Sequence, residues 1–305
     1  MRDVAPTAEG RRWLLPPEAL VRLENLALIS RWAVEGFLQG LHASPYHGFS
    51  VEFAEYRQYV AGEDLRHFDW KALAKSDRAY VKRFHAETNL KGHILLDGSA
   101  SMGYGPPGGP SKLRYGACLA AALAHLLVRQ QDAVGLGVYA EKLERWLPPR
   151  SSSRHERDLI QALEGVRPSG GTKTAEALHV VAEMIKGRGL VVLITDLYDD
   201  PAALLSALKH FRFKRHEVIV FHLLDPAERA LGVDGLSEFR DLESGERLQV
   251  MPAAYRDEYR RALEAFVDGW RRDCSAALID YQVLDTSTPF ERALSAYIHK
   301  RTRLG

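Results

Sequence analysis

The chain of 305 residues has few cysteines: Cys118 and Cys274 are the only two, and they lie far apart in the sequence. Two isolated cysteines give neither a disulfide framework nor a cysteine-ligated zinc site. Cys118 falls in a stretch rich in alanine and leucine, so we expect it to be a small core residue.

Long apolar runs are also missing. No segment approaches the ~18 consecutive apolar residues that a membrane-spanning helix needs. The first 20 residues carry charged side chains, among them Arg2, Glu9, Arg11 and Glu18. Because these charges interrupt any apolar core there, we expect no signal peptide. The sequence therefore predicts a cytoplasmic protein without a membrane span.

The chain also has no large excess of charge of either sign. The 41 basic residues oppose 40 acidic ones, which leaves a formal net charge of +1. This balance speaks against a general nucleic-acid-binding or membrane-surface protein. The hydrophobic content of 46% and the charged content of 27% are ordinary for a soluble globular protein.

Short apolar runs do occur beyond residue 90, at 93–96, 134–139, 190–195 and 218–224. Their length and β-branched content are typical of strands that are covered on both faces. Between or beside them lie helical patterns at 112–130, 174–186 and 202–211. Strand and helix alternate, which predicts an α/β fold with a doubly wound, mostly parallel sheet of the Rossmann type.

The end of the chain predicts a different mixture of elements. Residues 238–250 predict a hairpin that turns at Gly245, and residues 255–274 predict a charged amphipathic helix. We expect a last strand at 277–284 and a closing helix at 289–300.

The first 90 residues form an N-terminal extension with too little core to fold alone. Residues 17–41 predict a helix, and residues 49–59 and 80–84 predict extended chain. We expect domain 1–90 to pack on the sheet domain 91–305. The apolar stripe of the predicted helix consists of Leu26, Ile29, Ala33 and Phe37.

The most informative residues are Asp97, Ser99 and Ser101, which follow the apolar run that ends at Leu96. Ligands of doubly wound sheets bind outside the carboxyl ends of the strands. Two further oxygen donors are expected at that edge: Thr172, in a loop that precedes a helix, and Asp196, which ends a strand. Hard divalent cations such as Mg²⁺ take oxygen ligands of this kind. Mn²⁺ accepts the same ligands.

The pattern Asp-x-Ser-x-Ser, followed by Thr172 and Asp196, resembles the metal-ion-dependent adhesion site of von Willebrand factor A domains. The resemblance implies that Ser99, Ser101 and Thr172 ligate Mg²⁺ directly and that the two aspartates act mostly through water. It also implies that an Asp or Glu of a client protein completes the metal shell.

The segment from Phe53 to Trp70, which reads FAEYRQYVAGEDLRHFDW, resembles the signature of one bacterial subfamily of these domains. That subfamily is catalogued as domain of unknown function fifty-eight and is commonly encoded beside MoxR-type AAA+ ATPases. The resemblance implies a non-enzymatic adaptor that works with such an ATPase in protein complex assembly or remodelling. Glu63 stands where an aspartate is usual, and many relatives have an amino-terminal membrane anchor.

The residue types of the signature also allow an interpretation that is independent of the resemblance. It mixes charges with large aromatics, which suits a partly buried lattice of ion pairs that clamps the extension to the sheet. A docking surface for a partner is the other interpretation. The candidate residues are Arg57, Tyr59, Gly62, Asp64, Arg66, Asp69 and Trp70.

Two enzymatic readings compete for the same sheet edge. The loop before Lys112 resembles a Walker A motif, but Pro110 removes a backbone donor that a phosphate cradle would use. Ser101 lies in an approximate nucleophile elbow, which would make the chain a serine or metal-assisted hydrolase. His222, a candidate partner, falls within an apolar strand and reads as a core residue. A metal-independent scaffold is the remaining alternative.

Overall fold

The computed structural model describes residues 20, 23, 25–43, 55–58, 80–83, 90–171, 173–233, 235–289, 294, 295 and 297. For residues 38–43, 55–58 and 80–83 it describes the backbone alone.

The chain divides into two compact units, residues 1–38 together with 90–305, and residues 39–89. In the second unit, β1 (Glu55–Gln58) pairs antiparallel with β2 (Tyr80–Arg83). These strands lie inside the two stretches that the sequence predicts to be extended. The predicted division into domains 1–90 and 91–305 stays a prediction, because much of the extension lies outside the described residues.

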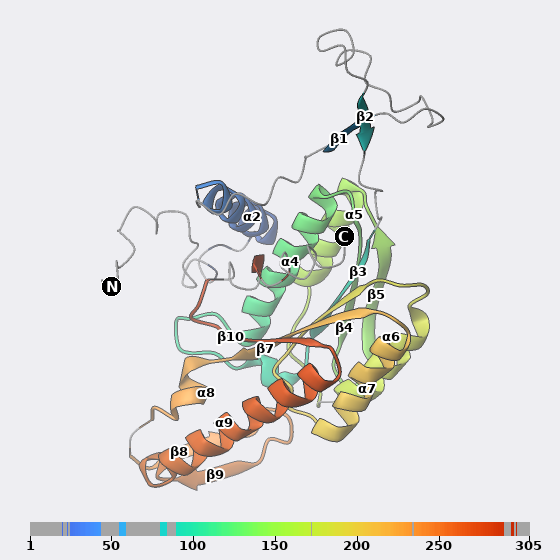
Figure 1. The fold of residues 1–305 in the computed structure, drawn as a ribbon. Helices are drawn as coiled ribbons and strands as arrows, with labels where there is room; N and C mark the ends of the chain where they lie inside the picture. Colours follow the sequence, from blue (N-terminus) through green and yellow to red (C-terminus); the bar gives the residue numbers. More distant parts are fainter. Residues whose placement is uncertain are drawn as a thin grey trace, which may run out of the picture. The chain divides into compact units, whose positions relative to one another are not determined.

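A six-stranded sheet forms the centre of the first unit (Figure 1). The strand order is β10-β7-β6-β3-β4-β5, and every neighbouring pair is parallel except β4 with β5. The predicted doubly wound, mostly parallel sheet is confirmed. The strands are β3 (Lys91–Asp97), β4 (Ala133–Tyr139), β5 (Leu143–Arg150), β6 (Leu190–Thr195), β7 (Glu217–Leu224) and β10 (Asp280–Asp285).

The central strands are apolar because helices cover both of their faces. In β6 every residue is buried, and in β3 every residue after Lys91 is buried. The chain leaves β3 to build β4 on one side and later β6 on the other. The strand order therefore reverses at β3, which is where ligands bind in open α/β sheets.

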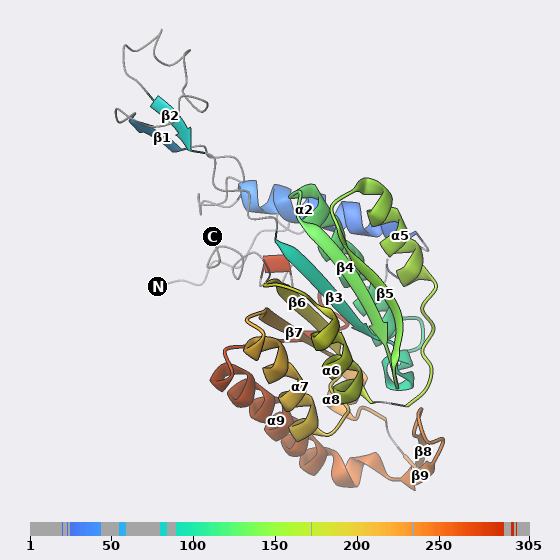
Figure 2. The same cartoon turned by 90° about the vertical axis from the view of Figure 1, so that its right-hand side faces the viewer.

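Helices cover the sheet in two layers (Figures 1 and 2). On one face lie α4 (Lys112–Arg129), α5 (Ser153–Glu164) and α2 (Leu26–Ala43); on the other lie α6 (Thr174–Met184), α7 (Pro201–Phe213) and α9 (Pro252–Ala276). The helices predicted at 112–130, 174–186, 202–211 and 255–274 therefore exist with small shifts at their ends.

The helix of the N-terminal segment packs on the sheet unit. Its predicted apolar stripe is buried throughout. The backbone N–H of Leu26 donates to Glu164 Oε1 at 3.2 Å, and the Arg114 side chain donates to the Leu20 and Leu23 carbonyls. For Leu20, Leu23 and residues 25–37, which the structure describes, the expected packing is thus confirmed. Helix α2 begins at Leu26. Leu20 is also helical, and the other residues of the predicted start, apart from Leu23 and Asn25, lie outside the described residues.

Several elements of the structure have no counterpart in the sequence-based prediction. β5 and α5 join β4 to the loop before α6, and the short helix α8 (Pro226–Ala230) follows β7. The predicted hairpin forms as β8 (Ser237–Arg240) and β9 (Arg247–Val250). The last strand begins at Asp280 instead of 277, because Leu278 has a φ of 57° and turns the chain. The closing helix predicted at 289–300 lies mostly outside the described residues.

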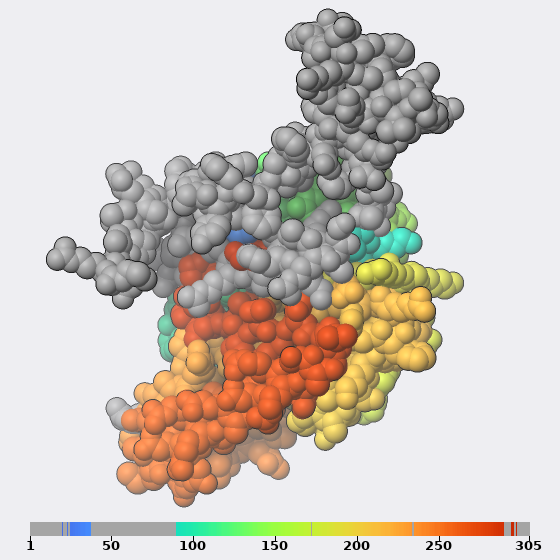
Figure 3. All heavy atoms as spheres, viewed as in Figure 1, coloured from blue at the N-terminus to red at the C-terminus, as the bar shows by residue number. Residues whose placement is uncertain are grey.

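Helix α9 presents most of its surface to solvent. Only Pro252, Trp270 and Cys274 are buried in it, and the space-filling view shows it as a continuous band across one face (Figure 3). Its remaining residues are exposed or partly exposed, as a charged amphipathic pattern predicts. Within the described parts of the chain, no helix combines the length and the apolar character needed to cross a bilayer.

Candidate metal site

The end of β3 forms a tight turn that carries one carboxylate and two hydroxyls. Asp97 is the last residue of β3 and is fully buried. Its Oδ1 accepts a hydrogen bond from the backbone N–H of Ser99 at 2.9 Å, as an Asx-turn requires. The hydroxyl oxygens of Ser99 and Ser101 lie 3.0 Å apart. The short 3₁₀ helix η3 (Ala100–Gly103) carries Ser101. The structure therefore brings these three residues together.

Thr195 connects this turn to the neighbouring strand β6. Its hydroxyl donates to Asp97 Oδ2 at 2.7 Å and accepts from the backbone N–H of Leu197 at 3.1 Å. Leu197 has a φ of 59°, a conformation that non-glycine residues adopt rarely and that marks a constrained turn. Asp196 lies between these two residues and is fully buried. Thr195 is not among the predicted site residues. Its signal in the sequence is a hydroxyl at the end of an otherwise apolar strand.

The third predicted loop also lies beside the turn. The backbone N–H of Ala100 donates to the Gly170 carbonyl at 3.2 Å. The next residue, Gly171, donates its N–H to Glu141 Oε1 at 2.9 Å. Thr172 itself lies outside the described residues, so its role stays a prediction. The part of the loop that precedes it is held at the correct edge of the sheet.

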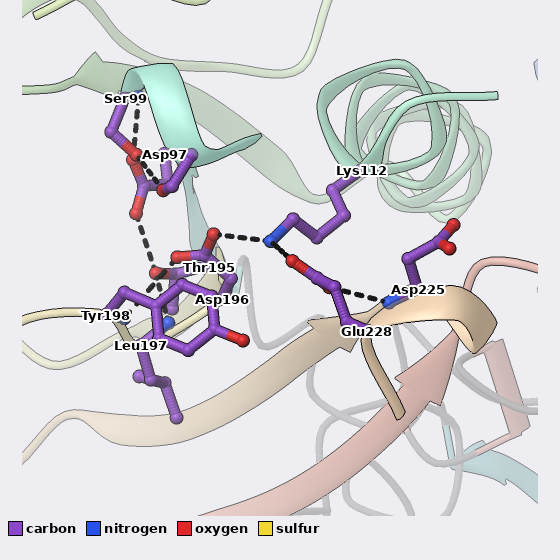
Figure 4. A network of polar contacts seen from close by, with 10 residues as sticks. Asp97, Ser99, Lys112, Thr195, Asp196, Leu197, Tyr198, Asp225 and Glu228 are labelled. Atoms are coloured by element: carbon purple, nitrogen blue, oxygen red, sulfur yellow. Dashed lines mark hydrogen bonds and ion pairs between the residues drawn. The ribbon is translucent and has the colours of Figure 1, made fainter. Parts of the chain in front are cut away.

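A buried lysine that is not among the predicted site residues lies beside Asp196 (Figure 4). Its Nζ is 2.9 Å from Asp196 Oδ2 and 2.6 Å from Glu228 Oε1. This lysine is Lys112, the first residue of α4, and its side chain is fully buried. The ring of Tyr198 lies 4.8 Å from the ammonium, and the ring of Tyr104 lies 5.8 Å from it.

Burial and neighbouring charges set the protonation of the site. Burial, and then the negative charge of Asp196, raises the pKa of Asp97 to about 7. Burial alone would lower the pKa of Lys112, but the carboxylates of Asp196 and Glu228 raise it above its ordinary value. Burial raises the pKa of Glu228, against the opposing effect of Lys112. The lysine is therefore a stable cation, and Asp97 has no cation of its own among these contacts.

The donor set fits a hard divalent cation. The turn offers the hydroxyls of Ser99 and Ser101 and the carboxylate of Asp97, and Mg²⁺ prefers oxygen ligands. A cation there would also relieve the buried negative charge that raises the pKa of Asp97. In the described residues, no group of three or more His, Cys, Asp and Glu side chains is arranged to hold a metal ion. The hydroxyls are thus the feature on which this site depends.

The two competing motifs have other roles in the structure. The lysine of the Walker-like loop points into the site as Lys112 and pairs with carboxylates. Ser101 lies in η3, and α4 begins only at Lys112, so the serine is not at the start of the helix that a nucleophile elbow needs. His222 is fully buried, and its Nδ1 lies 2.5 Å from the Tyr281 hydroxyl. Burial lowers the pKa of His222 to about 4.

Most of the predicted docking residues of the signature lie outside the described residues. Arg57 lies in β1, of which the structure describes the backbone alone. The other predicted docking residues are not described, and their roles stay predictions. They are Tyr59, Gly62, Asp64, Arg66, Asp69 and Trp70.

Residues 55–266, more than half of the chain, match the model of the family described as "Protein of unknown function DUF58". The chain belongs to the DUF58 family. The match includes residues 55–70 of the signature segment and the turn at Asp97. It confirms the family resemblance stated from the sequence, and the strand order agrees with the von Willebrand factor A-like fold that the resemblance implies.

Curated relatives and solved structures resemble the DUF58 chain over most of its length. An uncharacterized protein of Mycobacterium tuberculosis is 27% identical over 275 residues, which cover 86% of this chain and 84% of the relative. Among solved structures, an aerotolerance-related membrane protein from Bacteroides fragilis has a TM-score of 0.47 at 22% identity, with 69% of this chain and 99% of that chain covered. The SpRpn10 VWA domain has a TM-score of 0.38 at 11% identity, with 68% and 93% covered.

The prediction of a cytoplasmic location is wrong as an inference from this sequence. The Bacteroides fragilis protein that the DUF58 chain resembles is described as a membrane protein. The prediction rested on the missing apolar run, and the lack of such a run in one chain does not fix where a protein works.

Proposed function

We propose that this DUF58 chain is a non-enzymatic protein-binding module that holds Mg²⁺, or Mn²⁺, at the carboxyl edge of its sheet. The observation that supports the proposal most is the pair of hydroxyl oxygens of Ser99 and Ser101, 3.0 Å apart beside the buried Asp97. These serines and, by the resemblance, Thr172 would hold the cation directly, with Asp97 and Asp196 acting through water. When bound, the cation supplies a Lewis-acidic centre for a carboxylate from a partner.

The contacts of the two serines favour binding over acyl transfer. A serine nucleophile needs a base within hydrogen-bond reach. In the described part of the chain, Ser99 and Ser101 have their hydroxyls paired with each other, and no hydrogen bond joins either one to a histidine. His222 instead contacts Tyr281. Contacts of this kind are typical of metal-ligating serines and of serines in turns.

The partner in this proposal is a MoxR-type AAA+ ATPase, and the client is a protein that supplies an Asp or Glu. The support is the resemblance of the segment 53–70 to the subfamily signature, together with the family match over residues 55–266. The DUF58 chain would act as an adaptor when the ATPase assembles or remodels client complexes.

The test is a pull-down of a purified MoxR-type ATPase from the same genome by the tagged DUF58 chain, once with Mg²⁺ and once with EDTA. The proposal expects capture with Mg²⁺, loss with EDTA, and loss with Asp97→Ala or Ser99→Ala. Ser206→Ala is the matched control, because Ser206 is exposed on α7. Capture that survives EDTA and both site variants would instead identify a metal-independent scaffold.

A further inference from the structure

Lys112 is unusual among the lysines of this chain. Of those that the structure describes, it alone is fully buried. It is also the first residue of α4, where the positive end of the helix dipole disfavours a cation. A buried ammonium in that position persists only if carboxylates compensate it. The structure supplies two, from Asp196 at the end of β6 and Glu228 on α8.

The pairing changes what Asp196 can offer to a metal ion. Its Oδ2 accepts a hydrogen bond from the ammonium of Lys112 at 2.9 Å. Its Oδ1 faces the backbone N–H of Tyr198 at 3.4 Å. Both oxygens therefore already have donors, and the carboxylate charge is already opposed by a cation of the chain itself. A divalent ion at the neighbouring hydroxyls would meet a site whose negative charge is partly neutralised.

We propose that Lys112 is a tethered cation that competes with the divalent metal ion for Asp196 and thereby lowers the metal affinity of the site. This inference rests on the proposed function. Its consequence is that metal and acidic partner bind with positive coupling, because a partner carboxylate restores the negative charge that Lys112 has offset. Lys112 is a positioning and tuning residue and ligates nothing itself.

Glu228 sets how strongly Lys112 acts on Asp196. The ammonium is shared between the two carboxylates, at 2.6 Å from Glu228 and 2.9 Å from Asp196. Glu228 is itself fixed by a capping box, in which its Oε2 accepts from the Asp225 backbone N–H at 2.9 Å. Glu228→Gln removes its charge while keeping its size, which leaves Lys112 to Asp196 alone. The two variants should therefore change metal affinity in opposite directions.

The experiment is isothermal titration of MgCl₂, and separately of MnCl₂, into the full chain. Lys112→Gln should bind the metal more tightly than the wild type, by about fivefold or more, which is the usual size of a coupling between two binding events. Glu228→Gln should bind the metal more weakly than the wild type. Lys142→Gln is the matched control, because Lys142 is an exposed lysine at the turn between β4 and β5, on the same edge of the sheet. Its affinity should equal that of the wild type.

Each result decides between the alternatives. If the wild type binds the metal and Lys112→Gln binds it equally or more weakly, the competition is overturned while the proposed function stands. If only Lys112→Gln binds, the competition is supported and the metal-dependent function of the wild type falls. If no variant binds, both fall. If circular dichroism shows that Lys112→Gln is unfolded, Glu228→Gln decides: unchanged or tighter binding overturns the inference.

Discussion

The ammonium of Lys112 lies 2.9 Å from Oδ2 of Asp196, so a carboxylate that the sequence assigns to a metal shell also belongs to a buried ion pair. The two roles draw on the same negative charge. The chemistry of this sheet edge therefore includes the lysine together with the oxygen donors.

The serine hydroxyls should decide whether the protein is stabilised by metal. A ligand that binds only the folded state raises the melting temperature. We expect MgCl₂ to raise the Tm of the wild type, and Ser99→Ala or Ser101→Ala to abolish most of that rise, because each removes one of the paired hydroxyl oxygens. Thermal unfolding with and without MgCl₂ measures it. Ser206→Ala should keep the full rise, and a rise of equal size in all three variants would place the metal elsewhere.

Removing the charge of Lys112 should destabilise the protein when metal is absent. Loss of one partner from a buried ion pair costs about 3–5 kcal/mol of unfolding free energy, since the other charge remains buried and unpaired. We expect this loss for Lys112→Gln in EDTA, from urea unfolding. Lys142→Gln, on an exposed residue, should change stability by less than about 0.5 kcal/mol. A Lys112 variant as stable as the wild type would show that the ion pair contributes nothing.

His93 should make the protein sensitive to mild acid. It is buried in β3, where it stacks on Trp146 with ring centroids 5.7 Å apart, and neither ring nitrogen has a partner among the described residues. Burial, with smaller effects of His216 and Lys91, lowers the pKa of His93 from 6.5 to about 4. Between these two values the unfolded chain binds more protons than the folded one, so stability falls as the pH falls from 6.5 toward 4.

The size of this effect follows from the pKa difference. It amounts to about 3 kcal/mol for His93 when the pH has dropped to 4. Urea unfolding of the wild type and of His93→Phe across that pH range measures it, because the two proteins differ in this one titratable group. The wild type should lose more stability than the variant. Parallel losses would mean that the pKa of His93 is the same in the folded and the unfolded state.

The hydrolase alternative predicts activity that depends on Ser101. Because no hydrogen bond joins Ser101 to a histidine in the described structure, we expect no hydrolysis in a panel of esters and phosphoesters, with or without Mg²⁺. Activity in that panel that disappears in Ser101→Ala would replace the binding role with a catalytic one.

The sequence predicts most of the fold because the strands are short, apolar and separated by amphipathic helices. It also predicts the turn at Asp97, since residues two apart at a strand end must lie together. The sequence pattern does not predict β5, because Pro148 and Pro149 interrupt it. Within a sheet, prolines are tolerated mainly in edge strands, and β5 is an edge strand.

The buried ion pairs could not be predicted in the same way. Lys112 meets Glu228 across 116 positions of the sequence, and nothing local in the sequence specifies such a contact. The one local signal is the lysine at the start of a helix whose next turns are alanine and leucine. A cation there opposes the helix dipole and calls for an acidic partner from elsewhere.

Anomalous scattering from crystals grown with MnCl₂ tests the central claim most directly. The account predicts one Mn²⁺ peak at bonding distance, about 2.0–2.3 Å, from the hydroxyl oxygens of Ser99 and Ser101, and no such peak in Ser99→Ala crystals. A map without a peak at this turn, or with its only strong peak at another place in the molecule, would contradict it.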